Sequence, residues 1–403
     1  MTTRRTIAFA TSTRADYGPA RWILADLAGR DDVDVMVLAT GTHLDPEHGR
    51  TIDEITADGL RHIIPVPVRI GSDAPIDRAA WLGDWLLGAT TALEEHRPDL
   101  LLLLGDRFET LIAAQAATLV GIPIAHLHGG EKTSGAIDDG IRHAITKLAH
   151  VHFAASEEYA VRIRQLGERN VHVYGSPGLC ALTREPALNA DEMIELLGRP
   201  LDRPYVIVTY HPVTAASAAQ SLAGVRALTE ALDRRSDLDV VITGVNVDPG
   251  FAPVDEVLRS FATNAGPRVL MVDSLGNRGY LTALGGAVAC LGNSSSGIVE
   301  APALGVPTIN IGPRQAGRLR AMSIIDVPES TNAILDALSR VQEPSFLARM
   351  RDQEPPYGRP GASARIAETL ATIDLHGLLV KDFVDCRSPM CPMIHDDDPP
   401  DTA

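Results

Sequence analysis

The densest group of acid–base side chains lies in the segment AHLHGGEKTSGAIDDGIRHAITK, residues 125–147. Crowding of imidazoles and carboxylates separates the pKa values of acids from those of bases, which lets catalysis run near neutral pH. The two aspartates have a second explanation, because a helix start favours acidic residues and pairs them with cations four residues on. That explanation leaves the preceding HLHGGE turn unaccounted for. The segment predicts acid–base catalysis by some of its ionisable residues: His126, His128, Glu131, Asp138, Asp139, Arg142 and His143.

A second segment, GNSSSG at residues 292–297, has the composition of a phosphate-binding turn. A buried strand ends at its first glycine, and a helix is expected to begin near Ser296. Backbone N–H groups, serine hydroxyls and the positive end of a helix dipole all favour a bound phosphate. Alternatively, Ser294 or Ser295 only caps the helix. The chain contains neither GxGxxG nor GxxxxGK[ST], which argues against a dinucleotide-binding fold and a P-loop ATPase.

Two charged residues near this turn could complete a site for a nucleoside diphosphate. Glu300 lies one turn into the expected helix, where its carboxylate could accept hydrogen bonds from a ribose diol. It could also be a surface residue that the helix dipole favours. Arg314, in GPRQAGR after the next strand, could close over the same pocket or remain solvated.

The other polar candidates come directly after apolar runs. Ligands of open α/β sheets bind outside the carboxyl ends of the strands. His211 precedes a proline, so it is not expected inside a helix. We therefore expect a cleft lined by residues at strand ends: Arg14 and Asp16 in TSTRADYG, Gly105, Asp106 and Arg107 in LLLLLGDRFET, His211 in TYHPVT, and Asn246 and Asp248 in TGVNVDPG.

The elements that must position these residues alternate between strand and helix. Runs such as LLLLLG are apolar on both faces, as strands covered by helices on both sides must be. Repeated strand–helix order predicts a parallel, doubly wound sheet. In the first half, strands are predicted at residues 6–12, 33–40, 62–68, 100–104, 122–127, 151–155 and 171–174, and helices at 77–96, 107–119, 138–150 and 157–166.

The same pattern restarts after a junction rich in Pro and Gly at residues 175–204. Strands are predicted at 205–210, 240–243, 268–272, 287–291 and 307–311, and a last helix at about 362–373. We therefore predict an α/β protein with two doubly wound, Rossmann-like domains, residues 1–178 and 179–360. The acidic, Pro-rich residues 383–403 are expected to be disordered.

Composition limits the partners. The chain has 403 residues, of which 45% are hydrophobic and 22% charged, as in a soluble globular protein of two domains. Its formal net charge of −16 argues against binding nucleic acid or anionic membranes. No apolar run reaches the roughly 18 residues of a membrane span, and the N-terminal apolar stretch is too short for a signal peptide. A cytoplasmic location is expected.

No metal or other cofactor is predicted. The histidines and carboxylates are dispersed, and the chain lacks HExxH. Of the four cysteines, Cys290 lies in an apolar strand pattern and is expected in the core. Cys180 stands alone, and Cys386 and Cys391 have no second pair with which to complete a metal site.

Together, five segments resemble the hydrolysing UDP-N-acetylglucosamine 2-epimerases of sialic- and legionaminic-acid synthesis. The segments are TRADYG, GDRFET, HGGEKTSGAIDDGIRHAITKLAH, YHPVT and GNSSSGIVEAPALGVPTINIGPRQAGR, in the family's order over roughly residues 6–375. The resemblance implies a GT-B-like fold with two domains facing a cleft, residues 361–382 packing back on the first domain, and a homodimer or dimer of dimers. It implies a UDP-sugar as substrate and UDP as product.

The reaction that the resemblance implies converts UDP-GlcNAc and water to ManNAc and UDP. A base removes the C2 proton, UDP leaves to give a 2-acetamidoglucal, and water adds with the opposite configuration at C2. Carried over to this sequence, the catalytic groups would be Asp106, His128, Glu131, Asp139 and His211. The substrate-binding groups would be Arg14, His43, Arg107, Arg142, Asn246, Asp248, Ser274, Ser294, Ser295, Glu300 and Arg314, with Glu300 on the ribose.

One residue departs from the sialic-acid branch, which has a catalytic Glu where this chain has His128. Relatives with HxHGGE include enzymes that act on UDP-N,N′-diacetylbacillosamine, so that sugar is the alternative substrate. Two other classes remain open. A GT-B glycosyltransferase would need an acceptor but not the acid–base segment, and a non-catalytic nucleotide-sugar sensor should lack Asp106, Glu131 and Asp139.

Overall fold

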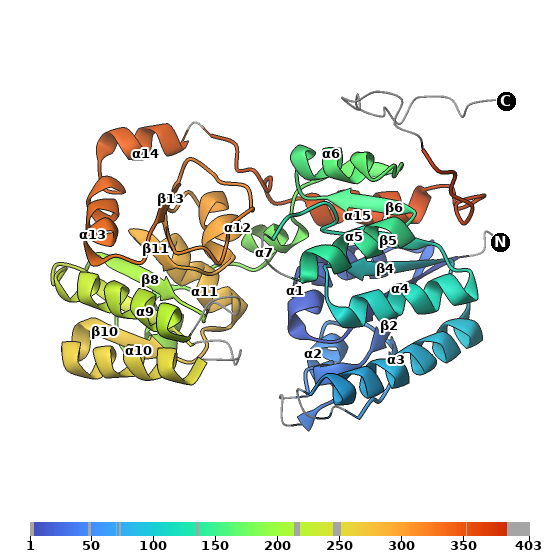
Figure 1. The fold of residues 1–403 in the computed structure, drawn as a ribbon, viewed down its shortest axis with the longest axis horizontal. Coiled ribbons are helices and arrows are strands. Elements are labelled where there is room, and N and C mark those ends of the chain that lie inside the picture. Colours follow the sequence, from blue (N-terminus) through green and yellow to red (C-terminus); the bar gives the residue numbers. More distant parts are fainter. Residues whose placement is uncertain are drawn as a thin grey trace. The chain divides into compact units, whose positions relative to one another are not determined.

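The computed structural model describes residues 4–46, 50–69, 71, 74–133, 137–212, 218–244, 251–351 and 353–384. Within these residues the chain forms two compact α/β units (Figure 1). The first contains the described residues up to 132, then 137–180 and 359–384. The second contains residues 181–358. The prediction of two doubly wound α/β domains is confirmed. No helix among the described residues is long and apolar enough to cross a membrane.

A parallel sheet of seven described strands forms the centre of the first unit, in the order β3-β2-β1-β4-β5-β6-β7. The order reverses between β1 and β4, which makes their carboxyl ends the switch point of the sheet. The strands are β1 (Arg5–Thr11), β2 (Val33–Ala39), β3 (His62–Pro65), β4 (Leu100–Leu104), β5 (Ile124–Leu127), β6 (Val151–Ala154) and β7 (Val171–Val173). The helices are α1 (Arg14–Ala28), α2 (Ile52–Ala57), α3 (Pro75–His96), α4 (Phe108–Val120), α5 (Asp138–Leu148), α6 (Glu157–Gln165) and α15 (Ala362–Thr372), with 3₁₀ turns at Gly41–His43 and Pro177–Cys180.

The five leucines of β4 show why the sheet needs helices on both faces. All are buried, and they alternate between two apolar clusters. Leu100, Leu102 and Leu104 pack with residues of α1, α2 and α15. Leu101 and Leu103 pack with residues of α3, α4 and α5. Since successive side chains of a strand point to opposite faces, a run of five leucines is stable only between two helix layers.

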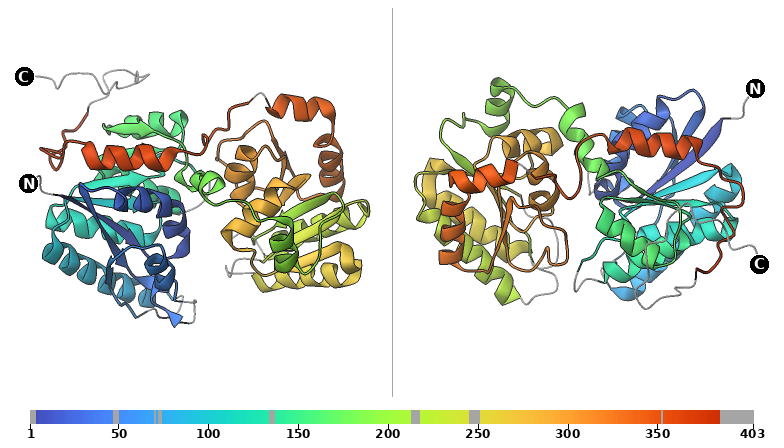
Figure 2. Two further views of the ribbon diagram at one scale, coloured as in Figure 1. Left: turned by 180° about the vertical axis from the view of Figure 1, so that it is seen from behind. Right: turned by 90° about the horizontal axis from the view of Figure 1, so that it is seen from above.

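The C-terminal helix α15 belongs to the first unit (Figure 2). Ala362, Ile366 and Leu370 are buried in the cluster that contains α1. Cys180 is the last residue of this unit before the chain enters the second unit. Its sulfur accepts hydrogen bonds at 3.4 Å from the backbone N–H groups of Gly361 and Ser363. The two points at which the chain leaves and re-enters this unit are therefore linked.

Beyond α15, Lys381 is anchored by a buried carboxylate. The side chain of Glu168 is 2% exposed and lies 2.5 Å from the ammonium groups of both Lys147 and Lys381. The ring of His152 is 3.4 Å away. Burial alone would raise the pKa of Glu168, but His152 and the two lysines lower it to about 2. The carboxylate thus holds the end of the described chain against β6.

Replacing Glu168 by Gln should destabilise the protein by about 3–5 kcal/mol at pH 7, because two ammonium groups lose a buried partner. The folded-state pKa is depressed, so the stabilisation is present above about pH 4.5 and is lost as the pH falls towards 2. Urea unfolding at pH 7 and pH 3 should show a smaller pH dependence in Glu168→Gln than in wild type. Glu157→Gln, at a 64% exposed side chain, is the control; equal losses in both variants would contradict the prediction.

The second unit is built on a parallel sheet of six described strands in the order β10-β9-β8-β11-β12-β13, and its order reverses between β8 and β11. Val206 and Val208 of β8 face the cluster that contains α9, α10 and α13, whereas Tyr205 and Ile207 face the one that contains α11 and α12. The strands are β8 (Tyr205–Thr209), β9 (Asp239–Thr243), β10 (Val269–Val272), β11 (Ala289–Gly292), β12 (Thr308–Ile311) and β13 (Ile324–Val327). The helices are α7 (Ala181–Arg184), α8 (Ala190–Leu197), α9 (Ala218–Asp233), α10 (Phe251–Ala265), α11 (Gly276–Gly285), α12 (Ser296–Ala303), α13 (Thr331–Arg340) and α14 (Pro344–Arg351), with a 3₁₀ turn at Gly266–Arg268.

Strand β13 is absent from the sequence-based assignment. It has only four residues, and Asp326 interrupts its apolar run at an exposed position. The carboxylate of Asp326 accepts hydrogen bonds from Asn310 of β12 at 2.6 Å and from Arg320 at 2.9 Å. This edge strand is stabilised by polar side-chain hydrogen bonds, which the pattern of apolar residues in the sequence cannot reveal.

Candidate active site

The predicted acid–base residues of the first unit follow two adjacent strands. Asp106 comes after β4, and His128 and Glu131 come after β5, which is the neighbour of β4. The N–H of Gly105 donates to the carbonyl of Leu127 at 3.1 Å, so the two strand ends stay in register. The carboxyl ends of β4, at the switch point, and of its neighbour β5 thus carry the acid–base residues that the sequence placed at strand ends.

Arg142 of α5 connects three parts of this site. Its side chain is 3% exposed and forms ion pairs with Asp106 and, at 2.7 Å, with Asp139. The same guanidinium donates to the backbone carbonyl of Glu131 at 2.9 Å. A planar guanidinium with several fixed donors suits this role, and a lysine ammonium does not. Arg142 therefore fixes the Asp106 carboxylate relative to the β5 turn.

Asp138 is one of the acid–base residues of the predicted segment, although the helix dipole and pairing offered a second explanation for it and the resemblance named Asp139 instead. Burial, and then the charge of Asp106, raise the pKa of Asp138 above its ordinary value. Its neighbour Asp139 is held by Arg142 instead. A carboxyl group whose pKa is raised carries a proton to higher pH, so Asp138 is suited to act as an acid.

His126 and His128 have different environments, although they are two residues apart. His126 is fully buried, and burial lowers its pKa to about 3. The neutral ring donates from Nε2 to the carbonyl of Gly105 at 2.8 Å, which positions the turn that carries Asp106. The Nδ1 of His128 lies 2.6 Å from Oε1 of Glu131. His128 is thus a half-buried imidazole oriented by Glu131, and His126 is part of the scaffold.

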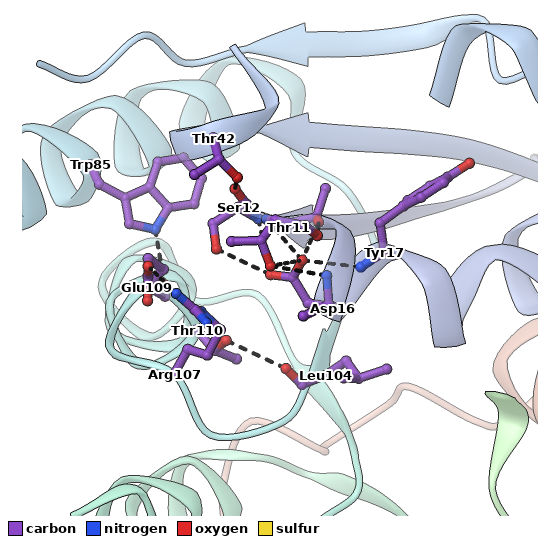
Figure 3. A network of polar contacts seen from close by, with 12 residues as sticks. Thr11, Ser12, Asp16, Tyr17, Thr42, Trp85, Leu104, Arg107, Glu109 and Thr110 are labelled. Atoms are coloured by element: carbon purple, nitrogen blue, oxygen red, sulfur yellow. Dashed lines mark hydrogen bonds and ion pairs between the residues drawn. The ribbon is translucent and has the colours of Figure 1, made fainter. Parts of the chain in front are cut away.

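Asp16 caps α1 at the end of β1 (Figure 3). Its carboxylate accepts hydrogen bonds from the backbone N–H groups of Ser12 at 3.0 Å and Thr13 at 2.9 Å. It also accepts from the hydroxyl of Thr11 at 2.8 Å. Asp16 is 4% exposed, so its role in this structure is to shape the β1–α1 turn.

His43 extends the same network. Its ring is fully buried, with Nε2 at 2.8 Å from the hydroxyl of Thr11 and Nδ1 at 2.7 Å from that of Thr51. Burial lowers the pKa of His43 below its ordinary value. Both ring nitrogens are therefore engaged within the unit.

The two other arginines of the first unit that were predicted to bind substrate are exposed and paired with glutamates. Arg14, the first residue of α1, forms an ion pair with Glu54 of α2. Arg107 lies 3.1 Å from Glu109, whose backbone carbonyl accepts from the indole of Trp85 at 2.9 Å (Figure 3). Pairs this exposed contribute little stability, so both guanidinium groups could exchange their partners for an anion.

Asn293 organises the strand ends of the second unit and was not among the predicted site residues. It is fully buried, and its amide exchanges two 2.8 Å hydrogen bonds with the backbone of His211. The backbone carbonyl of Asn293 accepts hydrogen bonds from the side chains of Arg314 at 3.1 Å and Gln315 at 2.9 Å. The sequence signal that could have identified Asn293 is its position in GNSSSG, directly after the end of β11. Burial, and then Arg314, lower the pKa of His211 to about 4.

The GNSSSG turn requires its first glycine. Gly292 has φ +130°, and a Cβ there would lie 2.0 Å from the carbonyl oxygen of Thr209. Ser295 is exposed at the start of α12 without a side-chain cap bond, and the hydroxyl of Ser294 accepts from the N–H of Ser296 at 3.4 Å. Glu300 is half-buried in the second turn of α12. The turn thus presents serines at a helix N-terminus, which favours an anion.

Three predicted binding residues remain. Ser274 is exposed before α11, and its hydroxyl accepts from the N–H of Gly276 at 3.2 Å. Asn246 and Asp248 lie outside the described residues. Within the described part of the chain, no group of three or more His, Cys, Asp or Glu side chains could hold a metal ion.

Two doubly wound units in one chain, with acid–base residues at the strand ends of one and a Gly-Ser turn at the strand ends of the other, form a GT-B-like fold. The family model of UDP-N-acetylglucosamine 2-epimerase matches residues 25–371, and the chain belongs to this family. It is an enzyme, as its relatives are.

Named relatives match most of the length of the chain. A UDP-N,N′-diacetylbacillosamine 2-epimerase (hydrolysing) of Legionella pneumophila is 34% identical over 93% of this chain and 98% of its own. A GDP/UDP-N,N′-diacetylbacillosamine 2-epimerase (hydrolysing) of Campylobacter jejuni is 32% identical over 95% and 99%. The fold is that of the UDP-GlcNAc 2-epimerase of Neisseria meningitidis, solved with UDP-GlcNAc, at a TM-score of 0.77 and 19% identity over 91% of this chain and 99% of that one.

Proposed function

We propose that this enzyme converts a UDP-activated 2-acetamido sugar and water to UDP and the free C2-epimeric sugar. The observation that carries the proposal is the joining of Asp106, Asp139 and the Glu131 backbone by one buried arginine at the switch point. A retained carboxylate cluster is needed for proton transfer at C2 and is not needed for binding a nucleotide sugar alone. Family membership supplies the reaction class.

In this proposal the first unit performs the chemistry and the second holds UDP. The serines at the start of α12 and Arg314 bind the diphosphate, and Glu300 binds the ribose. His211 is neutral at pH 7, because its pKa lies near 4, and assists the departing diphosphate as a hydrogen-bond partner. Arg14, His43, Arg107, Ser274, Asn246 and Asp248 remain proposed substrate contacts, with the described ones placed as above.

Of the two candidate sugars, UDP-N,N′-diacetylbacillosamine is the one that appears in the names of the Legionella and Campylobacter relatives. Both enzymes match nearly end to end. The sequence alone ranked UDP-GlcNAc slightly ahead, and the likeness to the Neisseria enzyme concerns the fold. We propose the bacillosamine derivative as the preferred substrate and UDP-GlcNAc as the second candidate.

NMR of the purified protein in D2O with each sugar tests this proposal. UDP release together with a free 2-epimeric sugar that carries deuterium at C2 would establish elimination followed by hydration, and the faster substrate names the preference. Intact substrate, or release of UDP with C2 unchanged, would contradict the epimerase. A glycosyltransferase would release UDP only after an acceptor is added.

The serine turn and Arg314 predict a measurable UDP site. Arg314→Ala should raise the Kd for UDP about 10- to 100-fold, since a hydrogen bond to a charged group contributes about 1.5–3 kcal/mol. Isothermal titration of UDP into the variant measures the change, with Arg340→Ala at the exposed end of α13 as control. An unchanged Kd would place Arg314 outside the phosphate site.

We also propose that the enzyme works in the cytoplasm as a homodimer or dimer of dimers. The oligomer rests on the family resemblance, and the location is the expectation drawn from the sequence. Light scattering coupled to size exclusion measures the mass against the 43.0 kDa of one chain, and a mass of one chain at micromolar concentration would contradict the oligomer.

A further inference from the structure

We propose that His128 and Glu131 form an acid–base dyad, in which His128 Nε2 exchanges the proton at C2 and Glu131 is its positioning residue. This inference deepens the proposed function and rests on it. It replaces the expectation that Glu131 itself transfers the proton. The observation behind it is the 2.6 Å hydrogen bond between His128 Nδ1 and Glu131 Oε1.

The hydrogen bond determines which ring nitrogen is basic. An ionised carboxylate can only accept, so Nδ1 must donate to Glu131 and the lone pair of the neutral ring lies on Nε2. Among the described residues, His128 Nε2 has no hydrogen-bond partner. The side chain of Glu131 is 6% exposed, and that of His128 is 19% exposed. The carboxylate is therefore the shielded member of the pair, and the imidazole faces outward.

The backbone of the turn is shaped around His128. This residue has φ +61°, in the left-handed region that a side chain with a Cβ rarely adopts. Its N–H donates to the carbonyl of Phe153 at 3.1 Å. Strained backbone of this kind persists where the surroundings enforce it, and it is concentrated at functional sites. Here the strained residue is the one whose imidazole is bonded to Glu131.

The residues after His128 lock this conformation. Gly130 has φ +73°, and a Cβ there would lie 2.2 Å from the carbonyl oxygen of Tyr159. Arg162 donates to the Gly130 carbonyl, and Arg142 donates to the Glu131 carbonyl at 2.9 Å. The distance between imidazole and carboxylate is thus set by two arginines and a tight turn, and not by the pair alone.

The elimination step balances with this assignment. Nε2 takes the C2 proton, the C2–H electron pair forms the C1=C2 bond, and the C1–O electron pair leaves with UDP. The imidazolium is stabilised by the Glu131 carboxylate until it returns its proton to solvent. Water then gives hydroxide to C1 while C2 receives a proton on the opposite face. That second proton needs a different donor, for which the candidates are Asp106, directly after β4, and Asp138, on which the charge of Asp106 acts.

A double-mutant cycle tests the dyad. Glu131→Gln should lower kcat about 100-fold, within the range of acid–base contributions, while KM and the Kd for UDP stay within threefold. With substrate deuterated at C2, the isotope effect on kcat should rise, because C–H cleavage becomes slower. In a His128→Glu background a carboxylate replaces the imidazole as base, so Glu131→Gln should then cost less than threefold. Glu157→Gln is the surface control.

Two results would overturn the dyad. One is an equal loss from Glu131→Gln in both backgrounds without a change in isotope effect, which is the signature of a structural glutamate. The other is full turnover in His128→Gly, a variant that suits φ +61° and is therefore expected to fold. Failure of wild type to release UDP and deuterate C2 would instead contradict the proposed function, so the two failures are distinguishable.

Discussion

Asp106→Asn should lower kcat by at least about 1,000-fold while the Kd for UDP changes less than twofold. The substitution preserves the shape of the side chain but removes the charge that pairs with Arg142 and that raises the pKa of Asp138. General acid–base catalysis typically contributes 10²- to 10⁴-fold. Because the substitution removes the carboxylate of Asp106 and also changes the pKa of Asp138, we expect a loss in the upper half of that range. Coupled assay of UDP release measures kcat, and titration measures UDP binding.

The same variant has a second expected signature. Without the negative charge of Asp106, the pKa of Asp138 should fall. Asp138 then loses its proton at lower pH, so the residual activity should decline at lower pH than in wild type. Asp84→Asn, at an exposed position of α3, is the matched control. Normal turnover in Asp106→Asn would remove Asp106 from the mechanism.

Arg142→Lys should lower kcat about 100-fold or more. One ammonium cannot replace the guanidinium that bonds Asp106, Asp139 and the Glu131 carbonyl together, and displacement of a catalytic group by about 1 Å can cost 10²-fold. Since Arg142 is not among the groups proposed to bind UDP, the Kd for UDP should remain within twofold. Steady-state kinetics with either sugar measures the effect.

Because the Arg142 side chain is 3% exposed, folding of the variant has to be measured separately. Thermal melts and UDP titration report whether both units are intact. Arg164→Lys, in a pair with Glu157 on α6, is the control for the substitution itself. A folded Arg142→Lys enzyme with wild-type kcat would show that Arg142 has no part in positioning the site.

The fold was predictable because its signals are local. Five consecutive leucines in β4 require two helix layers, and the predicted strand has the observed bounds. The predicted 122–127 strand begins two residues early, since Ile122 and Pro123 are apolar but precede the ladder. Strand β13 was missed because Asp326 breaks its pattern, and the side-chain partners that compensate come from Asn310 and Arg320.

The site was predictable as a set of positions, but not as a set of partnerships. The rule that ligands bind at the carboxyl ends of parallel strands placed Asp106, His128 and His211 from sequence alone. It could not show that His43 is enclosed by two threonines, because that depends on residues from different turns. Nor could spacing separate Asp138 from Asp139, since only the position of Arg142 gives the two carboxyl groups different environments.

The packing of α15 on the first unit has a consequence for biosynthesis. The guanidinium of Arg5 donates to the carbonyl of Leu370 at 2.8 Å, across a separation of 365 residues. The core around α1 therefore lacks one of its helices until the last part of the chain has been translated. The second unit, by contrast, is complete once residue 358 has been made. Domains usually fold in the order in which they emerge from the ribosome. In this chain, the half that is translated first is the half that finishes folding last.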